Sequence, residues 1–317
     1  MPLTEKSLIA GIRARAHRSR SVVLGIGDDC SILRIPPGHE VLVTTDFSLE
    51  GVHFRREWHP PEVVGHRCLA RGLSDIAAMG GEPVAAFLSL GLPRKVQKAW
   101  VDGFLRGLLR LADAFHVSLA GGDTAESPGG VLADIMVVGS APKGAAIRRS
   151  GARWGDRIYV SGSLGGAAAV LKLLFSGRRL QPKDYPEHFH PVPRIGVGRF
   201  LRGRKLATAM IDISDGLSTD LGHICEESGV GAEIQAEAIP LARIGKLDRA
   251  VDLKFALHGG DDYELLFTVP RAKRIPAKIA GVPITHIGEI TLGKRVVLID
   301  GVVRRELKPE GWQHFRK

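Results

Sequence analysis

Residues 211–224 read IDISDGLSTDLGHI, and this stretch predicts a strand that ends in carboxylates just before a helix begins. A strand is expected over 208–211, and a helical pattern runs from about Gly216 to Glu227. Small residues let the backbone approach a bulky anion, hydroxyl groups supply oxygen ligands, and carboxylates hold Mg²⁺, a hard cation. The stretch is therefore typical of a site that binds a metal ion and a phosphate.

Five further segments share this composition of acidic residues flanked by Gly, Ser or Thr. They are GIGDD (25–29), VTTD (43–46), LSDIAAMG (73–80), AGGDT (120–124) and HGGDDYEL (258–265). Together with residues 211–216 they hold ten acidic residues, spread along the whole chain. This set predicts an enzyme that depends on Mg²⁺ and uses ATP.

Length and composition predict a water-soluble protein of two domains. The chain has 317 residues, of which 44% are hydrophobic and 25% charged, and this length exceeds the usual size of a single core. No apolar run approaches the ~20 residues of a membrane span, and the N-terminus lacks the apolar core and cleavage site of a secretory signal. We expect a cytoplasmic protein that binds no membrane.

Cysteine usage and net charge exclude other classes. Cys30, Cys68 and Cys225 lie far apart without CxxC spacing, which argues against disulfides and zinc and predicts free buried thiols. The net charge of +10 invites a nucleic-acid hypothesis, but the Lys and Arg residues are scattered and not interleaved with aromatic residues. We expect no nucleic-acid partner.

The expected elements mix strands and helices without a strict βαβα order. In the first half, strands are expected over 22–26, 31–35, 41–47, 84–91 and 131–139, and helices over 7–16, from 60–61 to about 73, and after Pro93. The polar, Gly-rich stretch 141–156 predicts the domain boundary, which we place between 142 and 143. In the second half, strands are expected over 157–160, 208–211, 231–235, 264–269 and 295–299, helices over 165–175, 216–227 and near 250–257, and a loop over 176–194. This order favours an α+β architecture.

Other nucleotide-binding motifs are absent from the sequence. It has no GxxxxGK[ST] segment and no kinase HRD and DFG pair, and Gly25-Ile-Gly27 lacks the third glycine of a dinucleotide fingerprint. The segment SGSLGG (161–166) lies between a strand and a helix, where it either cradles a phosphate or, as we favour, allows close packing. ATP binding is therefore expected to depend on the carboxylate set.

Taken in order, the motifs resemble the thiamine-monophosphate kinases, a family of the aminoimidazole ribonucleotide synthetase-like superfamily. The resemblance is carried by SLIA, LGIGDDC, TTD followed by GVHF, LSDIAAMGGEP, GGDT, RSGARWGDRIYVSG, IDISDGLSTDLGHI, GGDDYELLFTVP and GWQHF. It implies a two-domain α+β fold with an ATP-binding and dimerisation domain at 1–142 and a second α+β domain at 143–317. It also implies a homodimer formed through N-terminal strands, with ATP in a cleft walled by N-terminal domains.

The resemblance implies a role for each matching position. Magnesium ligands are expected at Asp29, Thr44, Thr45, Asp46, Asp75, Asp123, Asp212 and Asp215, ATP contacts at Gly122, Asp123, Arg149 and Ser214, and thiamine phosphate contacts at His53, Asp261 and Trp312. Structural roles without a ligand contact remain open as alternatives: Asp28 and Asp262 as turn caps, Asp215 as a helix N-cap, His53 as a surface histidine and Trp312 as a core anchor. A metal cluster of His188, His190 and His223 is not expected.

Two positions depart from the family pattern. Residues 259–262 read Gly-Gly-Asp-Asp where the family usually has Gly-Gly-Glu-Asp, so a direct substrate contact at Asp261 is expected to become water-bridged. His258 stands where the family commonly has a small residue.

The reaction that the resemblance implies is transfer of a phosphoryl group from ATP to thiamine phosphate. The acceptor is a phosphate monoester, which is already largely ionised near pH 7 because its second pKa is about 6. No side chain then has to act as nucleophile or base, and direct in-line transfer with several Mg²⁺ ions is expected. The alternative is another ATP-dependent synthetase of the superfamily, such as aminoimidazole ribonucleotide synthetase. A selenophosphate synthetase and a hydrogenase maturation protein are disfavoured by the positions of the cysteines and by the WQHFRK ending.

Overall fold

The computed structural model describes residues 5–16, 19–246 and 248–312. The chain divides into two compact units. Unit 1 contains Met1–Ile76 and Gly81–Gly144, and unit 2 contains Ala77–Gly80 and Ala145–Lys317. The α+β, two-domain architecture expected from the sequence is confirmed. The predicted domain boundary lies two residues before the change of unit at 144.

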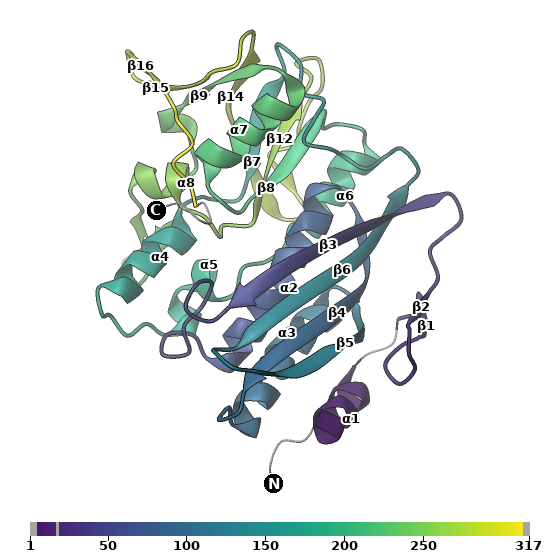
Figure 1. Ribbon diagram of the computed structural model, residues 1–317. Helices are drawn as coiled ribbons and strands as arrows, with labels where there is room; N and C mark the ends of the chain where they lie inside the picture. Colours follow the sequence, from purple (N-terminus) through teal and green to yellow (C-terminus); the bar gives the residue numbers. More distant parts are fainter. Residues whose placement is uncertain (1–4, 17–18, 247, 313–317) are drawn as a thin grey trace. The chain divides into compact units, whose positions relative to one another are not determined.

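Unit 1 is a four-stranded sheet with two helices on one face (Figure 1). The strand order is β3 (His39–Leu49), β6 (Leu132–Pro142), β4 (Glu82–Pro93), β5 (Ser118–Ser127), and only the β4–β5 pair is parallel. Helices α2 (Pro61–Ala78) and α3 (Lys98–Ala114) cover one face. The two helices pack so closely that only glycine fits at two positions. A Cβ added at Gly65 would lie 1.9 Å from the Phe104 carbonyl oxygen, and a Cβ added at Gly107 would lie 1.8 Å from the Glu62 carbonyl oxygen.

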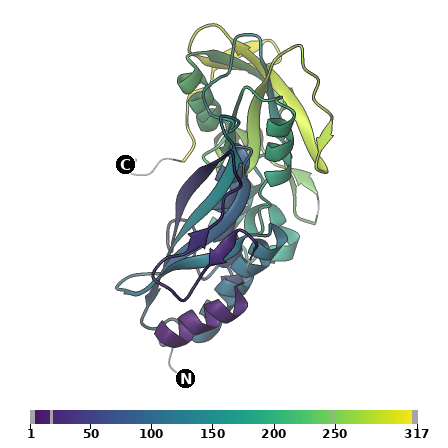
Figure 2. The same ribbon diagram turned by 90° about the vertical axis from the view of Figure 1, so that its right-hand side faces the viewer.

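The opposite face of this sheet is covered only in part. The hairpin of β1 (Val22–Leu24) and β2 (Ile32–Leu33) packs Val22 and Leu33 against Val84, Ala85 and Ala120 at the β4–β5 side. Helix α1 (Glu5–Arg15), purple in Figure 2, precedes this hairpin. At the β3 side, apolar side chains stay open: Val41, Val43 and Phe47 are 52%, 60% and 55% exposed. An edge strand of this length with an apolar exposed face is a surface that another chain can cover.

Unit 2 is built on an eight-stranded mixed sheet. Its strands run in the order β16 (Val303–Glu306), β15 (Val296–Asp300), β9 (Gly231–Gln235), β14 (Val282–Thr291), β7 (Arg157–Ser161), β12 (Glu264–Val269), β8 (Ala209–Ile213), with β13 (Lys278–Ile279) paired to β14; β10 (Arg243–Ile244) and β11 (Arg249–Ala250) form a separate pair. The helices are α4 (Gly166–Phe175), α5 (Pro186–Phe189), α6 (Ile195–Gly203), α7 (Leu217–Ser228) and α8 (Leu253–His258), with 3₁₀ turns η1 (Pro182–Asp184) and η2 (Ala236–Ala238). Apolar side chains of α7 and of the central strands share one core.

Some elements differ from the prediction. The sequence pattern predicts no strand at β5 or β14 and no helix at α6, and it predicts a loop over 176–194, where η1 and α5 occur. β5 contains the Gly-Gly-Asp segment and is polar along its second half, so its alternation is hidden. Among the described residues, no helix is long and apolar enough to cross a membrane.

Candidate active site

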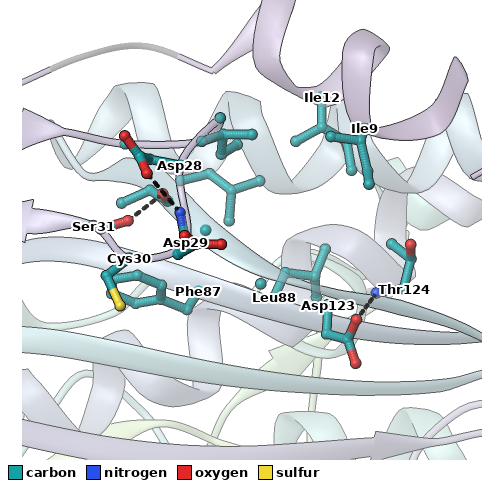
Figure 3. A pocket seen from close by; sticks show the side chains of 17 residues that line it. Ile9, Ile12, Asp28, Asp29, Cys30, Ser31, Phe87, Leu88, Asp123 and Thr124 are labelled. Atoms are coloured by element: carbon teal, nitrogen blue, oxygen red, sulfur yellow. Dashed lines mark hydrogen bonds between the residues drawn. The ribbon is translucent and has the colours of Figure 1, made fainter. Parts of the chain in front are cut away.

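The first group of expected site residues lines a pocket of about 480 Å³ in unit 1 (Figure 3). Asp29 and Cys30 reach it from the loop after β1, Gly122 and Asp123 from β5, and Ile9 from α1. The loop is fixed to β5 because the Ser31 hydroxyl donates a 2.6 Å hydrogen bond to the Ala120 carbonyl oxygen. Asp29 and Asp123 therefore face one cavity although 94 residues separate them.

Backbone geometry explains the residue types in this pocket. Gly122 has φ +144°, and a Cβ there would lie 1.9 Å from the Leu88 carbonyl oxygen, so only glycine fits against β4. The Asp28 carboxylate accepts a hydrogen bond from the Asp29 N–H at 3.0 Å, which is the turn-capping role considered for it. The Asp123 carboxylate accepts one from the Thr124 N–H at 2.8 Å, which leaves it further lone pairs for a cation.

A second group lies at the β3 edge of the sheet. The Thr44 hydroxyl donates a short hydrogen bond to Asp75 Oδ2 of α2, and Asp46 Oδ1 lies 3.8 Å from Arg71 Nε. Thr44 and Asp46 point to the helix-covered face, since they alternate with exposed neighbours on β3. The structure thus brings Thr44, Asp46 and Asp75 to one side of one edge.

Thr45 is not brought to that group. Thr45 lies on the other face of β3, in line with Val43 and Phe47. Its hydroxyl therefore cannot lie beside the Thr44 hydroxyl and the Asp46 carboxylate. Its role as a magnesium ligand stays a prediction.

The two groups of unit 1 lie at opposite edges of the sheet. β3 and β5 are the outer strands, separated by β6 and β4. Three strand spacings of about 4.8 Å place these edges roughly 14 Å apart. Asp46 of β3 and Asp123 of β5 therefore cannot bind the same ion within one chain, since ligands of one Mg²⁺ lie about 2.1 Å from it.

His53 follows β3 in a turn. Its Nδ1 accepts a 3.0 Å hydrogen bond from the Leu49 N–H, which fixes the neutral tautomer with the proton on Nε2. The residue is half-buried and its ring is hydrogen-bonded, so His53 is not simply a surface histidine.

A third group lies in unit 2, around the turn between β8 and α7. Asp212 is buried near the end of β8, and Ser214, Asp215 and Gly216 form the turn, which we call the SDG turn. Gly216 has φ +115° and begins α7 without a side-chain cap, so Asp215 is not the N-cap of this helix. The alternative of Asp215 as a helix N-cap is therefore wrong.

Asp220 is a site residue that the sequence reasoning missed. Its buried carboxylate accepts hydrogen bonds from the N–H groups of Asp215 (3.2 Å) and Gly216 (3.0 Å) and holds the SDG turn in place. Burial, with the nearby charges of Asp212 and Asp215, raises the pKa of Asp220 well above its usual value. An acidic residue on the apolar face of an amphipathic helix was the signal available in the sequence.

Asp215 and Asp220 also lie with His223, their ligand atoms within 4.8 Å of one another. His188 is elsewhere: it is buried, and its Nδ1 contacts the Ala167 carbonyl oxygen at 3.1 Å. A cluster of His188 with His223 is therefore not formed.

The GGDDY loop, residues 259–263, packs against the SDG turn. The N–H of Asp261 donates to the Ser214 carbonyl oxygen at 2.9 Å, and that of Tyr263 donates to Ile213 at 2.9 Å. Asp261 and Tyr263 have φ values of +66° and +52°, an unfavourable conformation for both, and the Tyr263 hydroxyl donates to Asp261 Oδ1 at 2.6 Å. Such local strain is common in binding loops.

Asp262, the neighbour of Asp261, has a structural role. Its carboxylate accepts hydrogen bonds from the N–H groups of Gly165 (2.6 Å) and Ala167 (3.4 Å) at the beginning of α4. Burial raises the pKa of Asp262 to about 8. The N-terminus of α4 is thus occupied by a carboxyl group, and Gly165 packs directly on α8, which supports the packing interpretation of SGSLGG.

The remaining expected contacts also lie in unit 2. Arg149 is exposed, and its carbonyl oxygen accepts a 3.3 Å hydrogen bond from the Ser228 hydroxyl. Trp312 is 54% exposed, and its N–H donates to the Asp215 carbonyl oxygen at 3.2 Å. The rest of the GWQHF motif, 313–315, lies outside the described residues.

Two of the three cysteines are buried thiols, and the third lines the pocket of unit 1. Cys68 and Cys225 are buried, and burial raises the pKa of each thiol to about 12, which makes both unreactive. Cys30 is exposed, so the expectation that all three thiols are buried was wrong for this residue, which sits on a loop.

Comparison with known proteins defines the class. The AIR synthase related protein N-terminal domain matches residues 27–141, and the AIR synthase related protein C-terminal domain matches residues 153–301. The chain is thus an AIR synthase related protein with both of these domains.

Within that class, the chain belongs to the thiamine-monophosphate kinase family. The thiamine-monophosphate kinase of Salmonella typhimurium is 40% identical over 305 residues, which cover 92% of this chain and 91% of the relative. The crystal structure of thiamine-monophosphate kinase from Stenotrophomonas maltophilia K279a is 37% identical with a TM-score of 0.82, covering 94% of this chain and 97% of that one. The structure of AaThiL complexed with AMPPCP and TMP is 32% identical with a TM-score of 0.79 and covers 99% of both chains.

Proposed function

We propose that this protein transfers the terminal phosphoryl group of ATP to thiamine monophosphate and forms thiamine diphosphate and ADP. The observation that carries the proposal is the end-to-end similarity to thiamine-monophosphate kinases, with every expected carboxylate present. The related AaThiL structure holds AMPPCP, an analogue of ATP, together with TMP. ATP as co-substrate follows from the same relative.

Magnesium ions are proposed as cofactors because the donor set fits them. The three groups offer mainly oxygen ligands from carboxylates and hydroxyls, with Asp29 and Asp123 in the pocket, Asp46 and Asp75 at the β3 edge, and Asp212 and Asp215 in unit 2. Burial and then the nearby carboxylates of Asp212 and Asp215 raise the pKa of Asp220, and a divalent cation would neutralise this concentration of negative charge. When bound, Mg²⁺ neutralises charge on the transferred phosphoryl group.

The side chains of this chain then act by binding and orientation. The acceptor phosphate of thiamine monophosphate is largely ionised near neutral pH, so no side chain has to remove a proton. Gly122 lets the polyphosphate approach β5, and Arg149 and Ser214 are proposed to contact the nucleotide. His53, Asp261 and Trp312 are proposed to contact thiamine phosphate, which places the acceptor oxygen in line with the bond that breaks.

We further propose that the protein acts as a homodimer whose active sites take residues from both copies. Within one chain, the ligand groups of β3 and β5 lie at opposite edges, and the exposed face of β3 carries Val41, Val43 and Phe47. A second copy that places its β5 edge beside this β3 edge covers those side chains. It also brings Asp123 of the partner subunit toward Asp46, which completes the ligand set.

The test of the activity measures both products. Purified protein with ATP, Mg²⁺ and thiamine monophosphate should form ADP and thiamine diphosphate in equal amounts, and ADP formation should depend on thiamine monophosphate. ADP released without thiamine diphosphate would reject the kinase activity. ADP formed only with formylglycinamidine ribonucleotide would favour the alternative, an aminoimidazole ribonucleotide synthetase.

A further inference from the structure

Three backbone N–H groups at the end of the described chain donate hydrogen bonds to the SDG turn and to the first turn of α7. The N–H of Gly311 donates to Thr219 Oγ1 at 3.1 Å, and the N–H of Trp312 donates to the Asp215 carbonyl oxygen at 3.2 Å. The N–H of Glu310 makes a longer contact of 3.5 Å with Ser218 Oγ. We call residues 310–312 the tail strap.

The tail strap lies against the SDG turn with no space between them. Gly311 is buried, and a Cβ added to it would lie 2.2 Å from the Asp215 carbonyl oxygen and 2.5 Å from Thr219 Oγ1. Only glycine allows the two backbones to approach this closely. The path of the tail strap is therefore set by the SDG turn and by the Thr219 hydroxyl.

Thr219 is the best-placed side chain of this contact. Its side chain is buried, at 5% exposure, and its oxygen accepts a 3.1 Å hydrogen bond from the N–H of Gly311 in the strap. The Ser218 hydroxyl has a second partner, since it lies 3.0 Å from His258 Nδ1. Loss of the Thr219 oxygen would leave the buried Gly311 N–H without a partner, which costs more than the hydrogen bond itself.

We propose that Thr219 is a positioning residue that acts through Trp312 on the binding of thiamine monophosphate. The inference rests on the proposed function, because it takes Trp312 as the residue that stacks on the substrate. The side chain of Trp312 is 54% exposed, whereas the backbone N–H groups of Gly311 and Trp312 are both hydrogen-bonded. The position of Trp312 thus depends on the hydrogen bonds of the strap, and Thr219 supplies one that is buried.

The first experiment compares Thr219→Val, which keeps the shape but cannot accept a hydrogen bond, with Thr219→Ser, which keeps the hydroxyl. Thr219→Val should raise KM for thiamine monophosphate by about threefold to tenfold, which corresponds to ~0.7–1.4 kcal/mol at ~1.4 kcal/mol per factor of ten. KM for ATP and kcat should change less than about twofold. Thr219→Ser should restore most of the KM. A KM that is equal in Thr219→Val and the wild type would overturn the proposal.

Thr268→Val is the matched control for general destabilisation. Thr268 is also buried in unit 2, and its Oγ1 accepts the Ala209 N–H at 3.1 Å. This variant should lower the melting temperature without a selective rise in KM for thiamine monophosphate. An equal rise in both variants would show a structural effect only and reject the positioning role.

A double-variant cycle with Trp312→Ala separates this proposal from the proposed function. If Thr219 acts through Trp312, Thr219→Val should add nothing to the KM of Trp312→Ala. Additive effects would reject the positioning role while leaving the substrate contact of Trp312 intact. If Trp312→Ala itself left the KM unchanged, the substrate assignment of Trp312 would be wrong, and the positioning role would fall with it.

Discussion

The two units hold their site residues in different ways. In unit 2, three segments distant in the sequence are joined backbone to backbone: Asp261 bonds to Ser214 and Trp312 bonds to Asp215. In unit 1, the site residues project from opposite edges of one sheet, and a side-chain hydrogen bond joins Thr44 and Asp75 at one of these edges.

This difference indicates which part of the site is formed within a single chain. The loops of unit 2 fix their side chains through their own hydrogen bonds, so this part is preorganised. The carboxylates of unit 1 have like charges and lie at opposite edges of one sheet. In the function that we propose, bound cations and a second copy bring them together. Variants of the two units should therefore fail in different ways.

The largest effect is expected from Asp46→Asn and Asp212→Asn, one variant in each unit. A neutral amide cannot replace a carboxylate that neutralises Mg²⁺, so each should lower kcat/KM by more than about a thousandfold with the fold retained. Steady-state kinetics at saturating Mg²⁺ and circular dichroism make the measurement, with the exposed Asp300→Asn as control. Activity within about tenfold of wild type, which is ~1.4 kcal/mol of barrier, would remove that residue from the metal site.

A smaller effect is expected from Val43→Asp on the exposed face of β3. A charge buried without a partner costs about 3–5 kcal/mol, so dimer formation should weaken by at least about a hundredfold. Sedimentation velocity should show a monomer whose activity recovers at high protein concentration. Val302→Asp, at a 99% exposed valine of unit 2, should remain dimeric. A fully dimeric Val43→Asp would mean that this face is not the interface.

Trp312→Ala should have a moderate and selective effect. An indole that stacks on the cationic thiazolium contributes roughly 0.5–2 kcal/mol, so KM for thiamine monophosphate should rise by about threefold to thirtyfold with little change in kcat. Kinetics and melting temperature are measured together. An unchanged KM with a melting temperature several degrees lower would show that the tail is a structural anchor.

The last effect concerns stability and its pH dependence in unit 2. Burial raises the pKa of Asp262 to about 8, above the unfolded value of 3.8. The stability that the protonated carboxyl contributes is therefore full below about pH 4 and is lost as the pH rises through 8. Relative to Asp262→Asn, the wild type should lose on the order of 1 kcal/mol of unfolding free energy per pH unit in this range. Urea unfolding curves with the same pH slope for both proteins would contradict the raised pKa.

Much of the fold was predictable because local patterns and burial agree. β9 and β12 were predicted at their observed bounds, since β9 alternates apolar and polar residues and β12 is a short, mostly apolar segment. β5 was missed because Gly121, Gly122 and Asp123 give it neither alternation nor β-branched residues, and its strand conformation depends on pairing with β4.

The candidate site was predictable as a set of residue types but not as a geometry. The acidic segments could be identified individually, whereas the separation of Asp46 and Asp123 to opposite edges follows from strand order, which no local pattern contains. The face of β3 on which Thr45 lies likewise became known only from the structure. Asp220 was overlooked because its partners, the N–H groups of Asp215 and Gly216, become visible only in the folded turn.

The most direct test of the central claim, that each active site combines the β3 edge of one copy with the β5 edge of another, mixes two inactive variants. Asp46→Asn and Asp123→Asn carry different tags and are co-expressed, and the heterodimer is isolated through both tags. In a two-fold dimer, one of its sites carries both substitutions and the other carries none, so the heterodimer should have about half of the wild-type activity. A heterodimer that is isolated intact and is as inactive as either parent would show that both carboxylates serve the same site from one chain, and the account would be wrong.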